Sequence, residues 1–182
     1  KSSGNLNIKT FCLFIKIQTM IIYLKNKDTL IIDDFKLKCC IGKKGISKNK
    51  FEGDFKTPKG KFKIGTLYWR KDRVKLPETK LICKKIKKNM VWCNDVNSNL
   101  YNKQINKKKN IKYEKLFRND NKYDYFILIE YNYKNTLKNK GSAIFIHLTK
   151  NYKPTAGCVA LSKKDFLILA KLIDNNCKIL IN

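Results

Sequence analysis

Short β-prone runs separated by polar turns are the feature that most limits the folds open to this chain. Apolar runs of this length, rich in β-branched and aromatic residues, are typical of strands, whereas helices need longer periodic segments. The sequence therefore predicts a mainly β fold that begins with a β-meander between residues 20 and 41. The expected strands are residues 20–24, 29–32, 37–41, 62–64, 126–131, 143–146 and 178–181.

One segment near the carboxyl end departs from this pattern and predicts a helix at about 163–174. Ser162 with Asp165 three residues later forms a helix-start signal similar to a capping box. Apolar residues then recur at helical spacing and would place one stripe of side chains in the core. These residues are Phe166, Leu169, Ala170 and Ile173.

Length and composition favour one globular domain. The chain has 182 residues, of which 43% are hydrophobic, so it is long enough to bury one good core. The formal charge of +27 suggests an anionic polymer, membrane surface or nucleic acid as partner. Lysine, asparagine and isoleucine are abundant together, as AT-rich coding sequences produce, so compositional drift is an equal explanation.

The seven cysteines show no pattern of metal ligands. They include no C-x-x-C pair, and the single histidine cannot complete a usual zinc site, so no structural metal and no cofactor are expected. Scattered cysteines in odd number are unusual for an oxidising compartment, and the redox location stays open. They are Cys12, Cys39, Cys40, Cys83, Cys93, Cys158 and Cys177.

The first residues give no clear targeting signal. Lys16 and Gln18 interrupt the apolar run between residues 8 and 24, so no membrane span is expected. A short apolar run after Lys9 imitates a signal peptide, but no small-residue cleavage site follows. We expect one domain over 20–182, with Met20 as a candidate start and residues 1–19 as an extension.

One histidine and one cysteine stand where predicted strands meet turns. His147 follows the run 143–146, and Cys158 follows Gly157 in a turn-like segment. A histidine within reach takes the proton of a weakly nucleophilic thiol and later returns one to a leaving amine. Glycine permits a turn that points the N–H groups of Gly157 and Cys158 at an oxyanion. A buried cysteine and a histidine satisfied in the core are the alternative.

The whole segment, GSAIFIHL at 141–148 and PTAGCVAL at 154–161, resembles the active-site signature of YkuD-type L,D-transpeptidases. In that family a histidine precedes a Ser/Thr-x-Gly-Cys turn. Two common family side chains, a histidine and an arginine, are replaced by Ala156 and Ala160, as in a proteobacterial branch with a TAGCVAL turn. The resemblance covers nearly all of 20–182. It implies a β-sandwich or barrel-like sheet with one short helix.

Three other segments carry the resemblance. Residues 50–60 resemble the family's GDGxTPxG element, with Phe55 in place of a glycine, and we expect a structural turn there. An R-x-D-R-V pattern at 70–74 provides guanidinium groups that could bind a substrate carboxylate. A W-C-x-D segment followed by Y-N provides aromatic rings and polar groups that could line a groove for a peptide or sugar. Core packing and solvated charge are the alternatives. The expected substrate contacts are Arg70, Arg73, Trp92, Asp95, Tyr101, Asn102 and Thr155.

The lysine-rich stretch 102–115 has few apolar residues, and we expect an exposed loop there. After it, an E-x-L-x-R pattern at 114–118 and a Tyr-Asp pair at 123–124 also resemble the family. The following strand, 126–131, is expected beside the strand that carries His147.

The resemblance implies two-step acyl transfer on a peptidoglycan stem tetrapeptide. The Cys158 thiolate attacks an L,D peptide bond, His147 protonates the departing D-alanine amine, and a thioester remains. The carbonyl of Leu148 or a neighbour is expected to orient the imidazole. The second step leaves three acceptors open, namely a diaminopimelate side chain that gives a 3-3 cross-link, a free D-amino acid, or water.

The resemblance also implies a monomer in the periplasm or cell envelope, with stem peptides and no nucleic acid as partners. Without a clear signal peptide, a cytoplasmic location stays open. Two alternatives stand beside the transpeptidase. One is an L,D-carboxypeptidase or amidase of the same fold, and the other is a basic wall- or nucleic-acid-binding module.

Overall fold

The computed structural model describes residues 19–182. All but the last residue of the expected extension 1–19, and with it Cys12, lies outside the described residues. The elements are β1 (Ile21–Asn26), β2 (Thr29–Ile32), β3 (Phe35–Cys40), β4 (Ile46–Ser47), β5 (Thr57–Pro58), β6 (Gly60–Trp69), β7 (Cys83–Lys85), β8 (Met90–Cys93), β9 (Gln104–Asn106), β10 (Tyr113–Lys115), β11 (Tyr125–Ile129), β12 (Phe145–Leu148), β13 (Val159–Leu161), α1 (Lys163–Leu172) and β14 (Lys178–Ile181).

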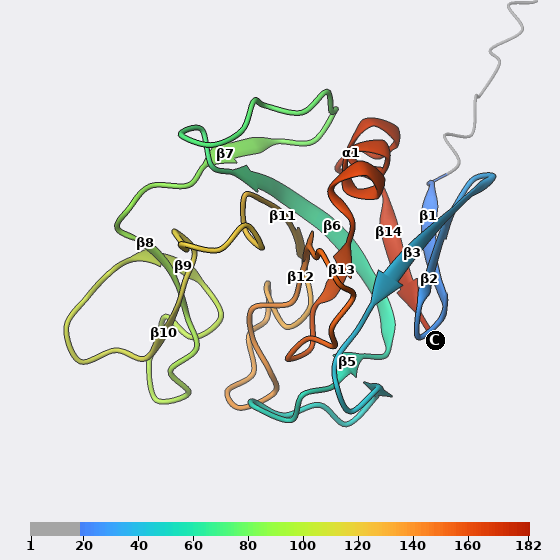
Figure 1. Cartoon of the computed structure of the whole chain (residues 1–182). Helices are drawn as coiled ribbons and strands as arrows, with labels where there is room; N and C mark the ends of the chain where they lie inside the picture. Colours follow the sequence, from blue (N-terminus) through green and yellow to red (C-terminus); the bar gives the residue numbers. More distant parts are fainter. Residues whose placement is uncertain (1–18) are drawn as a thin grey trace, which may run out of the picture.

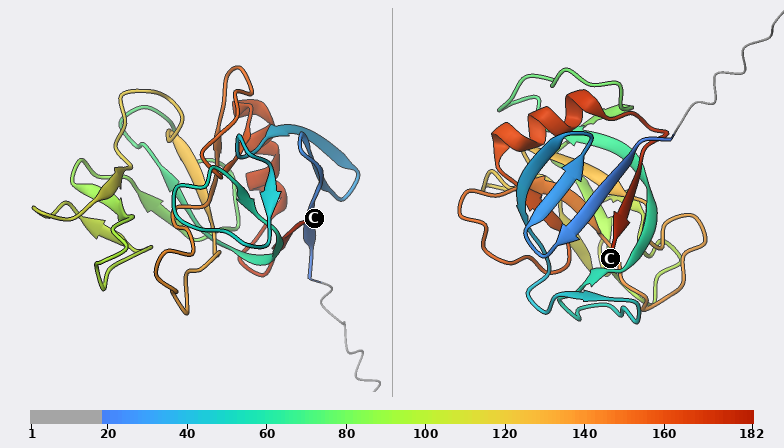
Figure 2. Two further views of the ribbon diagram at one scale, coloured as in Figure 1. Left: turned by 90° about the horizontal axis from the view of Figure 1, so that it is seen from below. Right: turned by 90° about the vertical axis from the view of Figure 1, so that its right-hand side faces the viewer.

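A barrel-like sheet forms the body of the molecule (Figure 1). Its nine strands lie in the order β11-β12-β13-β3-β2-β1-β14-β6-β7, and β11 also pairs with β6, which closes the ring. The right-hand view of Figure 2 shows the blue amino-terminal strands beside the red carboxyl-terminal strand, in keeping with the parallel pairing of β1 and β14. The predicted mainly β, barrel-like fold with one short helix is confirmed.

Most strand predictions agree with this sheet. The exception is β12, which lies two residues later than the strand expected at 143–146, so His147 lies inside the strand and does not follow it. β1, β2 and β3 pair in sequence order as antiparallel neighbours, so the expected meander is present. β11 lies beside β12, with Phe126 opposite His147, as expected. The strand expected at 62–64 is longer, because β6 continues to Trp69 and pairs there with β11.

The one helix of residues 19–182 begins where the sequence indicates. Ser162 is its N-cap, and the Ser162 hydroxyl accepts a 3.1 Å hydrogen bond from the N–H of Asp165. The helix ends at Leu172, two residues before the expected end. Its apolar stripe is fully buried in the main core and packs on β12 and β13, which fixes the strands on either side of the Cys158 turn.

A second, smaller sheet lies at one side of the barrel, on the left in Figure 1, with the strand order β10-β8-β9. The expected exposed loop at 102–115 was therefore wrong in part, since β9 and β10 lie within it and only the segment between them is a loop. Ile105 and Tyr113 provide the physical reason, because both pack against Val91 and Cys93 of β8. A few well-spaced apolar side chains are enough to pair the two ends of a polar stretch.

The two faces of β12 pack in different cores. Ile146 lies in the main core with the helix, whereas Phe145 lies in a second cluster with Trp92, Phe126 and Cys158. This follows from the alternation of side chains along a strand. The second cluster therefore supports the face of β12 from which His147 projects.

Among residues 19–182, no helix is long and apolar enough to cross a membrane. The cysteines of this part of the chain form no disulfide with one another.

Candidate active site

Cys158 and His147 project from the same face of two neighbouring strands. β12 and β13 are parallel, with Ile146 paired to Val159 and His147 paired to Ala160. Paired residues point to the same side of a sheet, so Ala160 shares the side of His147. Side chains alternate along a strand, so Cys158, two residues before Ala160, lies on that side as well. Both side chains line a cavity of about 760 Å³. The two residues that the sequence singled out are thus brought together in one hollow.

The Cys158 thiol is held by main-chain groups. It donates a 3.1 Å hydrogen bond to the carbonyl of Ala143, and the N–H of Phe145 lies 3.4 Å from the sulfur as a donor. Only 7% of Cys158 is exposed. Burial raises the pKa of the Cys158 thiol to about 12, and the negative charge of Glu114 acts in the same direction. The resting sulfur is therefore a thiol.

The His147 ring is oriented by the main chain. Its Nδ1 lies 2.9 Å from the carbonyl of Leu148, which can only accept, so Nδ1 carries the proton and Nε2 is the free acceptor. This is the contact expected of Leu148. Burial lowers the pKa of His147 to about 4, and the charges of Lys122 and Arg118 add to that effect. The resting pair is a neutral thiol and a neutral imidazole.

The turn before Cys158 is fixed by the Thr155 hydroxyl. It donates a 2.6 Å hydrogen bond to the carbonyl of Cys158 and accepts a 3.1 Å bond from the N–H of Gly157. The Gly157 N–H is therefore engaged by Thr155, which differs from its expected role as a free oxyanion donor. Among residues 19–182, the Cys158 N–H donates none of the hydrogen bonds found.

Gly157 is required by a close backbone approach. Its φ is +147°, and a Cβ there would lie 2.8 Å from the carbonyl oxygen of Lys56. Any larger residue would push the 50–57 loop away from the Cys158 turn. The glycine before the cysteine thus joins two segments that are about a hundred residues apart in the chain.

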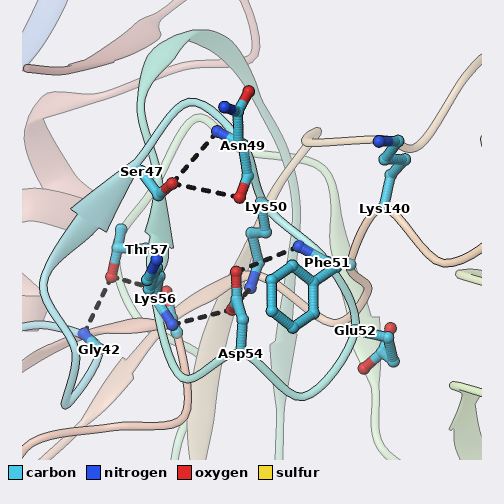
Figure 3. Close-up of polar contacts among 12 residues, drawn as sticks. Gly42, Ser47, Asn49, Lys50, Phe51, Glu52, Asp54, Lys56, Thr57 and Lys140 are labelled. Carbon is cyan, nitrogen blue, oxygen red and sulfur yellow. Dashed lines mark hydrogen bonds and ion pairs between the residues drawn. The ribbon is translucent and has the colours of Figure 1, made fainter.

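The 50–57 loop supports the cysteine turn through Thr57. Figure 3 shows the polar contacts inside this loop, with Thr57 bonded to Gly42 and Lys50 beside Asp54. The buried Thr57 hydroxyl donates a 2.9 Å bond to the carbonyl of Gly157 and accepts a 2.9 Å bond from the N–H of Gly42. Inside the loop, the Lys50 ammonium lies 2.6 Å from the Asp54 carboxylate, and both side chains are almost fully buried. The segment 50–60, which resembles the family's GDGxTPxG element, therefore supports the cysteine turn, in keeping with the structural turn expected there.

The two arginines expected to contact substrate hold the chain together instead. Arg70 is 2% exposed and binds Asp72 through two hydrogen bonds of 2.8 and 2.7 Å. Its guanidinium also donates to the carbonyl of Arg118 and lies over the ring of Phe117. Arg73 donates to main-chain carbonyls at 119 and 120 and to Asp124. Neither arginine lines the cavity.

The aromatic and amide residues of the second expected contact group lie behind the cavity wall. Trp92 is fully buried, and its Nε1 donates a 2.8 Å bond to Asn102 Oδ1. Asn102 Nδ2 binds the carbonyls at 131 and 132, while the Tyr101 hydroxyl donates to Glu52. Asp95 lies at a separate surface hollow, where it accepts main-chain N–H groups at 97 and 112. Of the seven expected contacts, the structure brings Thr155 into the cavity.

Other residues, not singled out from the sequence as contacts, line the cavity in their place. Glu114 accepts a hydrogen bond from the Tyr123 hydroxyl, and the Tyr123 ring lies edge-on to His147 at 5.3 Å between centroids. Glu52, Asn94 and Ser142 line it as well. All five residues belong to segments that carried the resemblance, but nothing in their residue types indicated that they would line the cavity.

This geometry, a cysteine and a histidine on adjacent strands of a barrel-like sheet above one hollow, defines the class of fold and site. Residues 12–181 match the family model of the YkuD L,D-transpeptidase catalytic domain. The chain belongs to this family. The match begins eight residues before Met20 and includes Cys158, His147 and the whole barrel.

Among solved structures, the chain is similar to the helical cell shape determining protein Pgp2, K307A mutant, from Campylobacter jejuni. The identity is 16% and the TM-score is 0.49, and the similarity covers 90% of this chain. It covers 47% of the Pgp2 chain, so this chain spans about half the length of that protein. No curated protein matches the chain.

Proposed function

We propose that this chain catalyses cysteine-dependent acyl transfer on peptidoglycan stem peptides, as an L,D-transpeptidase. The observation that carries the proposal is the placement of the Cys158 thiol and the His147 imidazole on one strand face, above one cavity. Membership of the YkuD family supports the same chemistry. Cys158 is the nucleophile, and His147 is the base and then the acid.

The neutral resting pair determines how the first step proceeds. The thiol has a raised pKa and the imidazole a lowered one, so no stable thiolate forms before the substrate binds. The Cys158 proton moves to His147 Nε2 as the sulfur attacks the carbonyl carbon of the substrate. The Leu148 carbonyl holds Nδ1–H and stabilises the imidazolium that forms. His147 then gives the proton to the departing amine, and a thioester remains on Cys158.

The developing oxyanion needs a hydrogen-bond donor beside the sulfur. The Cys158 N–H is our candidate, because it makes none of the hydrogen bonds of the described chain, whereas the Gly157 N–H donates to Thr155. Thr155 contributes by holding the turn, because its hydroxyl accepts from the N–H of Gly157 and donates to the carbonyl of Cys158. In the second step, an amine or water attacks the thioester and restores the thiol.

The family also supports a place of action at the cell envelope, with stem peptides as the partner. The basic charge of the chain suits an anionic wall. We propose action as a monomer and without a cofactor, since acyl transfer by a cysteine and a histidine needs neither a second subunit nor a bound group.

The test is incubation with purified tetrapeptide muropeptides, followed by chromatography and mass spectrometry. We expect release of D-alanine, and we expect Cys158→Ala and His147→Ala to abolish it while Cys83→Ala, at a cysteine outside the cavity, retains it. Cross-linked dimers identify a stem amine as acceptor, an exchanged terminal residue identifies a free D-amino acid, and trimmed monomers alone identify water. Full activity in Cys158→Ala would refute the proposal.

A further inference from the structure

One corner of the cavity contains hydrogen-bond acceptors whose partners are missing. We call it the acceptor corner, and it consists of Glu52, Asn94, Glu114 and Ser142, all of which line the cavity that holds Cys158. They come from three separate segments, namely the 50–57 loop, the small sheet and the turn before β12. Their convergence therefore depends on the fold.

Two of these acceptors are buried polar atoms without a partner. Ser142 is 8% exposed, and its Oγ lies near the Tyr101 hydroxyl but forms no hydrogen bond of good geometry within residues 19–182. The same holds for the buried Oδ1 of Asn94. Leaving a buried polar atom unpaired costs about 1–3 kcal/mol, so such atoms are normally completed by ordered water or by a ligand.

The other two are carboxylates without a cation. In the part of the chain that the structure describes, neither Glu52 nor Glu114 forms an ion pair, although the chain carries 41 lysines and arginines. Glu52 accepts from the Tyr101 hydroxyl and Glu114 from the Tyr123 hydroxyl, which leaves each carboxylate further lone pairs. Arg118, the cation that acts on Glu114, is bound to Asp120.

The register of the small sheet places these groups near one another. Glu114 of β10 is paired with Trp92 of β8, and Asn94 follows two residues later, so it lies on the same face as Glu114. The charge of Glu52 raises the pKa of Glu114, after the larger effect of burial, so the two carboxylates lie close enough to repel. Burial and the charge of Glu52 both favour the neutral form of the Glu114 carboxyl, and a positive donor that enters the cavity beside it would favour the charged form.

We propose that the acceptor corner binds a primary ammonium group of the peptide in the cavity. An ammonium carries three donors and one positive charge, which matches two carboxylates, an amide oxygen and a hydroxyl. The inference rests on the proposed function for the identity of the peptide. It adds that substrate selection depends on a free amine, because an acylated amine has lost both the charge and two of its donors.

The experiment measures binding to Cys158→Ala, so that the readout does not depend on turnover. The ligands are a stem tetrapeptide whose third residue has a side-chain amine, the same peptide acetylated on that amine, and the same peptide acetylated at its amino terminus. Calorimetry gives the Kd of each. We expect one acetylation to weaken binding by about tenfold or more, and the peptide affected identifies which amine is bound.

A second variant assigns the effect to the corner. Glu52→Gln in the Cys158→Ala background retains an acceptor for the Tyr101 hydroxyl but removes the charge, and we expect the difference between free and acetylated peptide to disappear. Glu130→Gln, which removes the same charge outside the cavity, is the matched control and should keep the difference. Equal binding of all three peptides to Cys158→Ala, or an undiminished difference in Glu52→Gln, would overturn the inference.

The two proposals fail in different ways. If the wild-type protein releases no D-alanine but the amine preference in binding is present, the acyl-transfer proposal fails and the acceptor corner stands. If D-alanine is released equally from free and acetylated peptides, the corner is wrong and the acyl transfer stands.

Discussion

The buried ion pair between Lys50 and Asp54 gives the sharpest prediction about stability. The ammonium and carboxylate lie 2.6 Å apart, with side-chain exposures of 4% and 1%. Lys50→Met keeps most of the aliphatic stem that packs against Gly141 but removes the charge. The variant leaves a buried carboxylate without its cation, which costs about 3–5 kcal/mol in comparable sites.

Asp54 retains two other partners, so the lower end of this range applies. The N–H groups of Phe51 and Lys56 donate to it at 3.1 and 2.9 Å and still stabilise the carboxylate. We therefore expect a loss of about 3 kcal/mol in the free energy of unfolding. For a chain of this size, that corresponds to a fall in Tm of about 6–12 °C.

The pH dependence provides an internal check. Burial alone would raise the pKa of Asp54, but the hydrogen bonds from Lys50, Lys56 and Phe51 together hold it below its usual value. A lowered folded-state pKa contributes stability above the unfolded value of about 4, and this is lost as the pH falls through the folded pKa. The gap between wild type and Lys50→Met should therefore be largest at neutral pH and should narrow below about pH 4.

The assay is urea unfolding followed by circular dichroism, at pH 7 and again at pH 3.5. Lys50→Met/Asp54→Asn is the control, because it removes the unpaired charge and should recover much of the lost stability. A loss below about 1 kcal/mol at pH 7, or a gap that is the same at both pH values, would refute the reasoning.

Three further predictions concern the cysteine turn. Because the pKa of Cys158 is raised to about 12, its alkylation rate, followed by peptide mass spectrometry, should rise steadily from pH 7 to 10, and a plateau near neutral pH would instead show a preformed thiolate. Gly157→Ala should lower stability by about 1–3 kcal/mol and abolish D-alanine release, since its Cβ would lie 2.8 Å from the Lys56 carbonyl, and wild-type Tm and activity would contradict this. Thr57→Val leaves the carbonyl of Gly157 without its donor and should cost about 1–3 kcal/mol in urea unfolding, whereas an unchanged midpoint would show that this contact contributes nothing.

The sequence indicates those parts of the fold that depend on local pattern. The β-meander, the Ser162 cap and the buried stripe of the helix each follow from residues close together in the chain, and the structure has all three. The pairing of β11 with β12 also agrees with the prediction. Local propensity and tertiary packing point to the same structure in these segments.

The parts that the sequence could not give depend on which distant polar groups satisfy one another. Trp92 and Asn102 belong to the motif that was expected to line a substrate groove. In the structure they form a hydrogen bond with each other behind the cavity surface. Arg70 has the chemistry of a carboxylate ligand, but the carboxylate it binds is Asp72, two residues away. Residue type indicates that a group needs a partner, and only the fold determines whether that partner is protein or ligand.

The lysine-rich segment shows a related limit. Its composition predicts an exposed loop, and most of its lysines are exposed. Two of its apolar side chains, Ile105 and Tyr113, nevertheless pack against Val91 and Cys93 of β8. These contacts order the two ends of the segment as strands. Average polarity over a segment conceals such single contacts.

The most direct test of the account is mass spectrometry after exposure to a carbapenem-type β-lactam, which acylates a reactive active-site nucleophile. We expect a single covalent adduct on the peptide that contains Cys158, absent in Cys158→Ala and formed at least about tenfold more slowly in His147→Ala. An adduct on another cysteine, or equal acylation with and without His147, would contradict it.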